Sequence, residues 1–324
     1  MLQNDSEIKQ PQLPFNNLYL NSGFVTGLNN WRFYVLTILI TTFIYLLAPA
    51  ITSLHLIFLA QSKGLSLETI ASDMNMLFDP KVSGIDKNLI LLALFGIFVF
   101  ASLAFFIALK KIHRKTLTSV LTGYDNFRFK RFWFAFGIWS ALVVIATLVE
   151  YFLNPQEFTF SFDLGGFLIG LLLLVIFMPI QSGFEEVFFR GYLMQGLSLI
   201  TKNGIVPLII TSLLFGAAHM SNPEAKEYGW ALMLTYYVFF AVFMGAITLI
   251  DEGLELAIGI HTANNIMASI LVSSDHSVIK TYSILEEKTT AVGADIVIWF
   301  ACALIAGFIF KFRYRWTNFN LLIK

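Results

Sequence analysis

The sequence predicts an all-α membrane protein, a polytopic helical bundle of about eight transmembrane segments. Of its 324 residues, 57% are hydrophobic and only 13% are charged, and the mean hydropathy is +0.74. Soluble domains carry about a quarter of charged residues, so this composition is typical of a multi-span membrane protein. The apolar residues are also gathered in runs long enough to cross a hydrocarbon core of roughly 30 Å at about 1.5 Å per residue.

We expect eight membrane segments along the chain. They cover residues 33–60, 89–109, 132–153, 165–200, 205–220, 230–250, 254–272 and 294–310. The fourth would measure about 54 Å as a straight helix, which is too long for a bilayer. Pro179 or Gly183 would kink it.

The distribution of basic residues predicts the orientation. The loop at residues 110–131 contains seven Lys and Arg residues against one acid, Asp125, and the tail after residue 310 contains four and no acid. Such segments stay in the cytoplasm, and eight spans place both of them there together with the N-terminal segment 1–32. The loop with Asp251, Glu252 and Glu255 would lie on the same side and runs against this pattern, although acids weigh little in the rule.

Several classes of protein are not supported. The net charge is zero and no basic block occurs outside these segments, which gives no support for nucleic-acid binding. The single cysteine, Cys302, excludes an internal disulfide and a multi-Cys metal site, and we interpret it as a small hydrophobe in a helix. Residues 1–30 show no cleavable signal peptide. With its short loops and no organelle address, the chain is expected in a bacterial cytoplasmic membrane, with both termini cytoplasmic.

The fourth run contains two adjacent carboxylates and a guanidinium, within GFEEVFFRG at residues 183–191. Ionisable residues inside a membrane segment cost several kcal/mol and are functional-site hypotheses by default. Glu186 and Arg190 are four residues apart with the acid first, which predicts an ion pair. Glu185 is rotated by about 100° from Glu186 and has Gln181 and two phenylalanines as helical neighbours. With no cation within a turn, it is free to act as a general base or a metal ligand.

Two later runs contain a histidine at a helical spacing from another candidate residue. FGAAH places Phe215 and His219 on one helical face, and HTANN does the same for His261 and Asn265. Both histidines have small neighbours, which let helices approach and polar side chains meet. We therefore expect these side chains to face Glu185.

The depth of these residues can be counted along the helices. Glu185 and His219 are each roughly 21–22 Å from the turn at residues 201–204, so a helical hairpin sets them at matching height. His261 is only about 10 Å above the start of its run. The three share one level only if the turn projects roughly 10 Å beyond the membrane.

Together the three motifs resemble those of the CAAX protease and bacteriocin-processing (CPBP or Abi) family, which includes lysostaphin-resistance-like proteins. EEVFFR matches EExxxR, FGAAH matches FxxxH and HTANN matches HxxxN, in this order on successive helices, and the resemblance covers residues 166–272. It implies an intramembrane endopeptidase whose catalytic core, residues 165–272, opens toward the cytoplasm. The substrate would be a membrane-embedded or membrane-anchored protein or peptide in the lipid bilayer. Before this core, residues 33–164 would form the N-terminal transmembrane helices. After it, residues 273–324 would form an external loop, the last span and the basic tail.

The resemblance also implies roles for individual residues. The catalytic positions are Glu185, His219, His261 and Asn265. The supporting positions are Glu186, Arg190 and Phe215. In the family the carboxylate activates water, the first histidine binds that water or a metal, and the second histidine and the asparagine steady the oxyanion.

Other interpretations stay open. Glu185, His219 and His261 would suit Zn²⁺, since two imidazoles and a carboxylate form a known catalytic pattern. The HExxH spacing of common zinc proteases is absent, which favours a mechanism with no cofactor. The same fold would also serve a non-catalytic immunity or scaffold protein, or a proton-linked transporter. Taken singly, His219 and His261 would be hydrogen-bonded core residues without a catalytic role. Glu186 and Arg190 would form a purely structural ion pair.

Other polar residues near the membrane runs have no evident partner in the sequence. Glu150 is close to the external end of the third run, where its side chain would reach the headgroups. His55, His113 and His276 are interpreted as structural or solvated residues.

Overall fold

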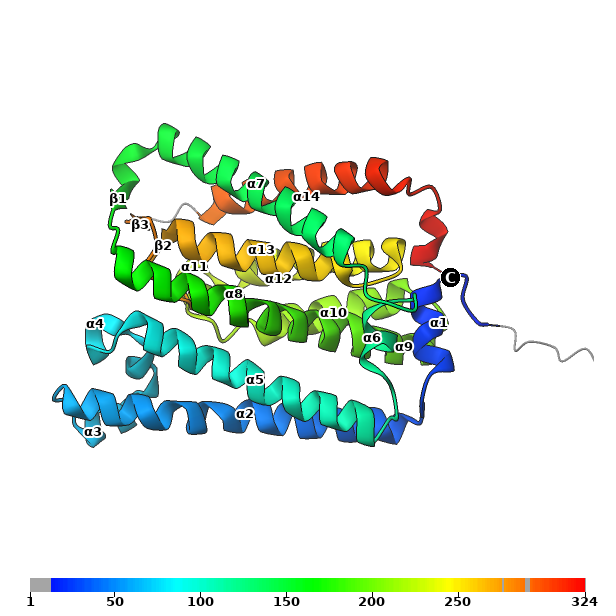
Figure 1. Cartoon of the computed structure of the whole chain (residues 1–324), viewed down its shortest axis with the longest axis horizontal. Coiled ribbons are helices and arrows are strands. Elements are labelled where there is room, and N and C mark those ends of the chain that lie inside the picture. The colour runs from blue at the N-terminus through cyan, green and yellow to red at the C-terminus, as the bar shows by residue number, and fades with distance from the viewer. Residues whose placement is uncertain (1–12, 276, 289–291, 324) are drawn as a thin grey trace, which may run out of the picture.

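The computed structural model describes residues 13–275, 277–288 and 292–323. Residues 1–12 of the polar N-terminal segment and His276 lie outside this description. The long helices run side by side along one axis (Figure 1). They are α2 (Trp31–Ser62), α5 (Lys87–Lys111), α7 (Phe129–Leu153), α8 (Leu164–Glu186), α10 (Ile205–Ala218), α12 (Trp230–Asp251), α13 (Glu255–Leu271) and α14 (Val292–Tyr314).

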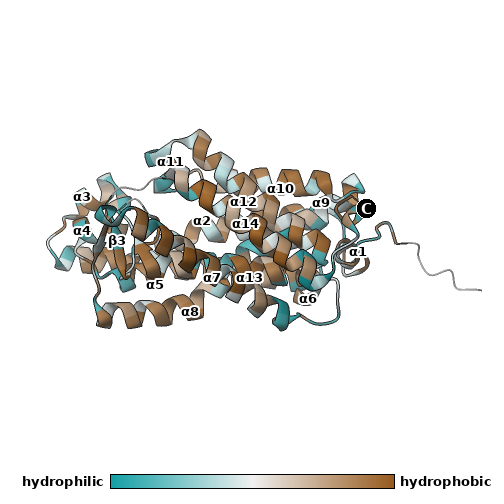
Figure 2. Cartoon of the chain, turned by 90° about the horizontal axis from the view of Figure 1, so that it is seen from above, coloured by the Kyte–Doolittle hydropathy of each residue, from teal (hydrophilic) through white to brown (hydrophobic). Residues whose placement is uncertain are grey.

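Short elements gather at the two ends of the bundle, where the polar residues also collect (Figure 2). One end holds α1 (Leu18–Val25), α6 (Leu117–Leu121) and η4 (Phe319–Leu322). The other holds α3 (Leu67–Ser72), η1 (Met74–Phe78), α4 (Pro80–Ser83), η2 (Pro155–Glu157), α11 (Pro223–Tyr228) and a sheet of β1 (Phe158–Phe160), β2 (Val272–Ser273) and β3 (Leu285–Glu287). In this sheet β3 is central, antiparallel to β1 and parallel to β2.

The predicted polytopic α-helical bundle is confirmed, because each of the eight apolar runs folds as a helix. In the described ranges, six helical spans are long and apolar enough to cross a membrane: Trp31–Ser62, Lys87–Lys111, Phe129–Leu153, Leu164–Thr201, Trp230–Asp251 and Gly293–Tyr314. The other two helices are shorter, α10 with 14 residues and α13 with 17. Most of α13 is buried against α7, α8 and α12. A helix enclosed in this way does not need an apolar surface toward lipid.

The long fourth run is interrupted by a π-helix. α8 continues through Pro179 and passes into η3 (Val187–Leu193), a π-helical segment, and then into α9 (Met194–Thr201). The kink at Pro179 or Gly183 stays a prediction, and the irregularity in the hydrogen-bond pattern lies further along, in the segment that contains Arg190. π-Helical segments inside α-helices are frequent at functional sites. Lys202, in the left-handed conformation, ends α9, and α10 packs back against it as the predicted hairpin.

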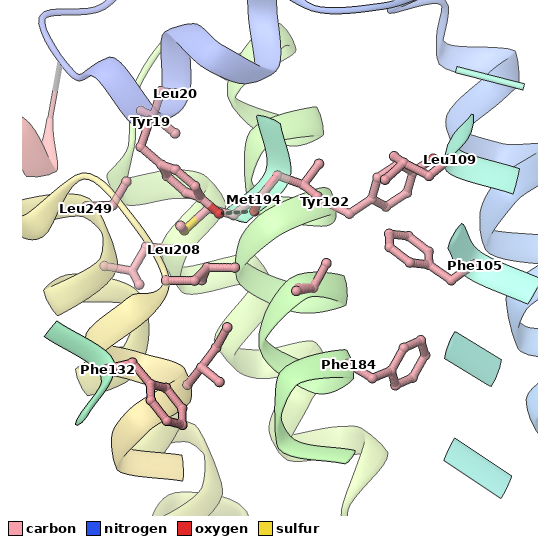
Figure 3. Packing of buried hydrophobic residues seen from close by; sticks show 14 of the residues in the cluster. Tyr19, Leu20, Phe105, Leu109, Phe132, Phe184, Tyr192, Met194, Leu208 and Leu249 are labelled. Carbon is pink, nitrogen blue, oxygen red and sulfur yellow. Dashed lines mark hydrogen bonds between the residues drawn. The ribbon is translucent and has the colours of Figure 1, made fainter. Parts of the chain in front are cut away.

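An aromatic cluster holds this helix in place (Figure 3). Phe105 of α5 meets Phe184 and Tyr192 edge to face, with ring centroids 6.2 Å and 5.3 Å apart. Tyr19 of α1 is fully buried, and its hydroxyl donates to the carbonyl oxygen of Arg190 at 3.1 Å. Each such aromatic pair contributes about 0.5–1.5 kcal/mol beyond burial. α1 and α5 therefore fix the helix that carries the two glutamates.

The acidic loop between α12 and α13 pairs with the basic loop before α7. Arg128 Nη2 lies 2.6 Å from Glu255 Oε2 and 3.1 Å from Asp251 Oδ2, and Arg131 also pairs with Asp251. Trp316, in the C-terminal tail, donates its indole N–H to Asp251. Asp251 and Glu255, the acids that the charge rule did not expect on the cytoplasmic side, are thus ion-paired with the basic loop. The C-terminal tail lies at the same end of the bundle (Figure 1). An even number of spans requires this common end.

We expect Arg128→Met to destabilise the protein, because both buried carboxylates lose a cation. Removing one partner of a buried ion pair costs about 3–5 kcal/mol, and the partial exposure of Arg128 favours the lower value. The free energy of unfolding in mixed detergent micelles measures this effect. Lys110→Met, which removes an exposed charge from the same end, is the control and should change stability by less than about 0.5 kcal/mol. Equal effects of the two substitutions would contradict a structural role for this cluster.

Candidate functional site

The residues of the three motifs meet in the interior of the bundle. Glu185 and Glu186 end α8, Arg190 lies in η3, and His261 is in the first half of α13. Glu186 and Arg190 are fully buried, while Glu185 and His261 are 8% and 4% exposed. Buried charges are tolerated only when they are paired or hydrogen-bonded. Their mutual contacts therefore decide which groups remain free for chemistry.

Glu186 is shared by two partners. Arg190 Nη1 donates to Glu186 Oε1 at 3.2 Å, which confirms the predicted ion pair. His261 Nδ1 lies 2.8 Å from the same oxygen. Because an ionised carboxylate only accepts, Nδ1 carries the proton and donates it. The guanidinium also stacks over the ring of Phe215 at 4.2 Å, which explains why this phenylalanine belongs beside the site.

Glu185 is held by a chain of hydrogen bonds between side chains. Gln181 Nε2 donates to Glu185 Oε1 at 2.6 Å, and Asn265 Nδ2 donates to Gln181 Oε1 at 3.2 Å. Asn264 donates in turn to Asn265 Oδ1 at 3.2 Å, and Trp139 donates to Asn264 Oδ1 at 3.1 Å. Each amide thus donates to the next group in one direction. Such a chain polarises its members and fixes one oxygen of the terminal carboxylate.

The second oxygen of Glu185 has no hydrogen-bond partner in the described part of the chain. It lies 3.5 Å from His261 Nε2. Since Nδ1 of this histidine carries a proton, the neutral ring presents a lone pair at Nε2. Two acceptors then face each other, and only a proton on one of them or a bridging donor satisfies both.

His219 lies at the C-terminal end of α10, slightly apart from this pair. Its Nδ1 is 2.8 Å from the carbonyl oxygen of Phe215, so Nδ1 donates and Nε2 keeps its lone pair. The ring of Phe215 contacts both histidines, with centroid distances of 4.3 Å to His219 and 6.3 Å to His261. Glu185 Oε2 and His261 Nε2 lie 3.5 Å apart, and the common level of Glu185, His219 and His261 in the membrane stays a prediction. His219 reaches them across the phenylalanine rather than through a hydrogen bond.

The side chains predicted for zinc do not converge. Within residues 13–275, 277–288 and 292–323, no group of three or more His, Cys, Asp or Glu side chains is placed to hold a metal ion. Glu186 occupies one nitrogen of His261, and the carbonyl of Phe215 occupies one nitrogen of His219. These contacts leave Nε2 of each histidine available and are of the kind that metal-binding histidines also make with their second nitrogen. The zinc interpretation therefore stays open, and we assign no step to a metal ion.

Two contacts of the site were not predicted from the sequence. One is the hydrogen bond from His261 to Glu186, because the sequence predicted only Arg190 as a partner of Glu186. The other is the bridging role of Gln181, whose only sequence signal is its spacing of four residues from Glu185.

Two of the remaining histidines are described. His113 is structural, since it is buried and bonds the carbonyl of Leu28 at 2.9 Å and the hydroxyl of Tyr192 at 2.7 Å. His55 is exposed on α2.

Comparisons with known proteins agree with the motifs. Residues 164–267 match the family model described as type II CAAX prenyl endopeptidase Rce1-like. The chain is also 28% identical over 215 residues to the uncharacterized protein YyaK of Bacillus subtilis (strain 168), over 65% of this chain and 71% of that protein. No solved structure matches the chain. The resemblance is confirmed over residues 164–267, where this multi-pass membrane protein is similar to the type II CAAX prenyl endopeptidase Rce1-like family.

Proposed function

We propose that the protein is an intramembrane endopeptidase in which Glu185 activates water for attack on a peptide bond. The single observation that carries this proposal is the state of Glu185. One of its oxygens is fixed by Gln181, and the other has no hydrogen-bond partner among the described residues and lies 3.5 Å from His261 Nε2. A positioned base needs this combination of a held carboxylate and an open oxygen. The match of residues 164–267 to an endopeptidase family supports the assignment.

The first step is removal of a proton from water. Glu185 Oε2 accepts the proton while the water oxygen bonds to the carbonyl carbon, whose π electrons move to the carbonyl oxygen. His219 Nε2, which keeps its lone pair, accepts a hydrogen bond from the other O–H of the water and so orients it, and that hydrogen stays on the oxygen. The result is a tetrahedral oxyanion next to a protonated Glu185. Glu185 then returns its proton to the amine nitrogen as the carbon–nitrogen bond breaks.

Two side chains stabilise the oxyanion. His261 donates from Nε2 when that nitrogen carries a proton, and Glu186 fixes the orientation of the ring because it accepts from Nδ1 at 2.8 Å. Asn265 uses one amide hydrogen for Gln181 and keeps the second for the oxyanion. Donors aimed at developing charge in a dry site are the largest common source of catalysis. Glu186 and Arg190 support the site by holding the histidine rather than by touching the substrate.

We place the catalytic core, residues 165–272, in a bacterial cytoplasmic membrane with the basic loop on the cytoplasmic side. The contacts of Arg128 and Trp316 with Asp251 support a common side for this loop and the C-terminal tail. His261 is six residues into α13 from that end, which is about 9 Å of helix. Substrates are therefore membrane-embedded or membrane-anchored proteins or peptides cut near the cytoplasmic boundary.

Glu185→Gln should stop the cleavage of natural substrates, because the amide cannot take the proton from water. Loss of a general base costs about 10²–10⁴-fold in rate. Comparative proteomics of membranes from cells with the wild type or the variant would show cleavage products that disappear. Glu68→Gln, an exposed change on α3, is the matched control. A non-catalytic immunity or scaffold protein would keep its cellular function in Glu185→Gln, and a transporter would instead lose a solute flux.

Gln181→Leu should lower kcat with little change in KM, since it releases Glu185 Oε1 and Asn265 without touching the substrate. Groups that orient metal ligands contribute about 10–100-fold, and we expect an effect of similar size for a group that orients a catalytic carboxylate. Steady-state cleavage of an identified substrate peptide by purified protein measures both constants. Gln61→Leu, at the exposed end of α2, should leave both unchanged. A rise in KM alone would assign Gln181 to substrate binding instead.

Metal removal should leave the activity intact. We expect purified protein to contain far less than one zinc per chain, and cleavage to continue after dialysis against 1,10-phenanthroline. Elemental analysis and an activity assay on the same sample check both points. Stoichiometric zinc, with activity lost on chelation and restored by added Zn²⁺, would replace the glutamate mechanism by a metal-dependent one.

A further inference from the structure

The imidazole of His219 lies between two aromatic rings. The ring centroid of Phe215 is 4.3 Å away, with 34° between the ring planes, and that of Tyr237 on α12 is 4.5 Å away at 32°. At these distances and angles each ring lies against a face of the imidazole rather than its edge. Two such rings do not fit side by side on one face of an imidazole. Phe215 therefore covers one face of His219 and Tyr237 covers the other.

His219 depends on this packing because of its place in the helix. α10 ends at Ala218, and His219 is its C-cap residue. No further turn of α10 follows to cover the imidazole, and the side chain is only partly buried. The hydrogen bond from Nδ1 to the carbonyl oxygen of Phe215, at 2.8 Å, holds one edge of the ring. The faces of the ring are held by the two aromatic side chains.

Close approach of α10 and α12 lets Tyr237 reach the histidine. A Cβ atom at Gly216, three residues before His219, would lie 2.6 Å from Cγ2 of Val238. Any larger residue at Gly216 would therefore push the two helices apart. Because Val238 directly follows Tyr237, this contact is close to the point where the tyrosine ring meets the imidazole. Small residues allow such contacts between helices.

Tyr237 is fixed in turn by the segment that follows His219. Asn222 donates from Nδ2 to the hydroxyl oxygen of Tyr237 at 3.3 Å. The backbone amide of Asn222 donates to the carbonyl oxygen of His219 at 3.1 Å. The phenol and the histidine are thus connected through this turn as well as through their rings. The position of the Tyr237 ring is thereby set relative to the imidazole.

Phe215, on the other face, cannot move away from the histidine. It is almost fully buried, and its ring also contacts the guanidinium of Arg190 at 4.2 Å. Catalytic groups keep their geometry only when packing locks their rotamers. Tyr237 presses the imidazole against this fixed ring, and loss of the tyrosine ring would open one face of His219.

We propose that Tyr237 is a positioning residue that aims Nε2 of His219 at the water activated by Glu185. The inference rests on the proposed endopeptidase function. The aromatic ring has this role rather than the hydroxyl group, because the ring covers the imidazole while the hydroxyl oxygen accepts from Asn222. Misplacing a catalytic group by about 1 Å costs up to about 100-fold in rate. Tyr237 thus acts on the reaction through His219.

The first test measures the motion of the His219 ring and needs no substrate. Full-length protein with isotope-labelled histidine is studied by solid-state NMR in phosphatidylcholine bilayers, where His219→Gln identifies the His219 signals. The order parameter of the His219 ring should fall in Tyr237→Leu and keep its wild-type value in Tyr237→Phe. Where the leucine variant folds poorly, Tyr237→Met removes the aromatic face with a longer side chain and should show the same fall. An unchanged order parameter without the aromatic ring would overturn the proposal.

The second test compares kinetics on a peptide that wild-type membranes cut and Glu185→Gln membranes do not. Tyr237→Leu should lower kcat about 10–100-fold with KM unchanged, and Tyr237→Phe should retain most of kcat. Tyr151→Leu removes an exposed tyrosine from the far end of α7 and should change neither constant. An equal loss of kcat in Tyr237→Phe and Tyr237→Leu would overturn the proposal, because it would assign the role to the hydroxyl group.

The two tests together separate this inference from the proposed function. Cleavage at the wild-type rate in Tyr237→Leu would contradict the positioning role and leave the endopeptidase intact. A mobile His219 ring in Tyr237→Leu, with no peptide cut by the wild type, would contradict the endopeptidase while the packing of His219 by Tyr237 stands.

Discussion

The shared oxygen of Glu186 is the contact on which the candidate site depends. It accepts from Arg190 at 3.2 Å and from His261 at 2.8 Å, and the carboxylate and guanidinium are fully buried. Neither charge is stable in that position alone, because an unpaired buried ion costs several kcal/mol. The ion pair therefore ties α8 and η3 together and also sets the orientation of the imidazole on α13. Through that imidazole it determines what Glu185 faces.

Close packing of α13 against α7 brings His261 within hydrogen-bonding distance of Glu186. A Cβ atom at Gly259 would come within 2.5 Å of the carbonyl oxygen of Phe132, so only glycine lets α13 approach α7 this closely. At Gly191 a Cβ would lie 2.6 Å from the carbonyl oxygen of Val120. Small residues at helix contacts thus let polar side chains from different helices meet. The aromatic cluster around Phe105 and Tyr192 then holds η3 against the rest of the bundle.

The sequence predicted those features that depend on local helical geometry. The eight helices follow from apolar runs, the Glu186 pair from a spacing of four residues, and the hairpin from the polar turn at residues 201–204. Contacts between helices were less accessible, because they depend on rotation and packing that no spacing encodes. Gln181 as a bridge and Glu186 as the partner of His261 belong to this class. The acids around Asp251 did not fit the predicted orientation for the same reason. Their ion pairs with the basic loop depend on packing, which a count of charges does not show.

The unlike roles of two neighbouring glutamates are the central claim, and one paired measurement tests it directly. Glu185→Gln and Glu186→Gln are compared for single-turnover cleavage of a substrate peptide and for free energy of unfolding in the same detergent. The account predicts that Glu185→Gln abolishes cleavage with stability nearly unchanged. It predicts that Glu186→Gln weakens cleavage and costs about 3 kcal/mol of stability, because Arg190 is left buried without its carboxylate. Cleavage that survives in Glu185→Gln, or a stability loss at Glu185 in place of Glu186, would contradict it.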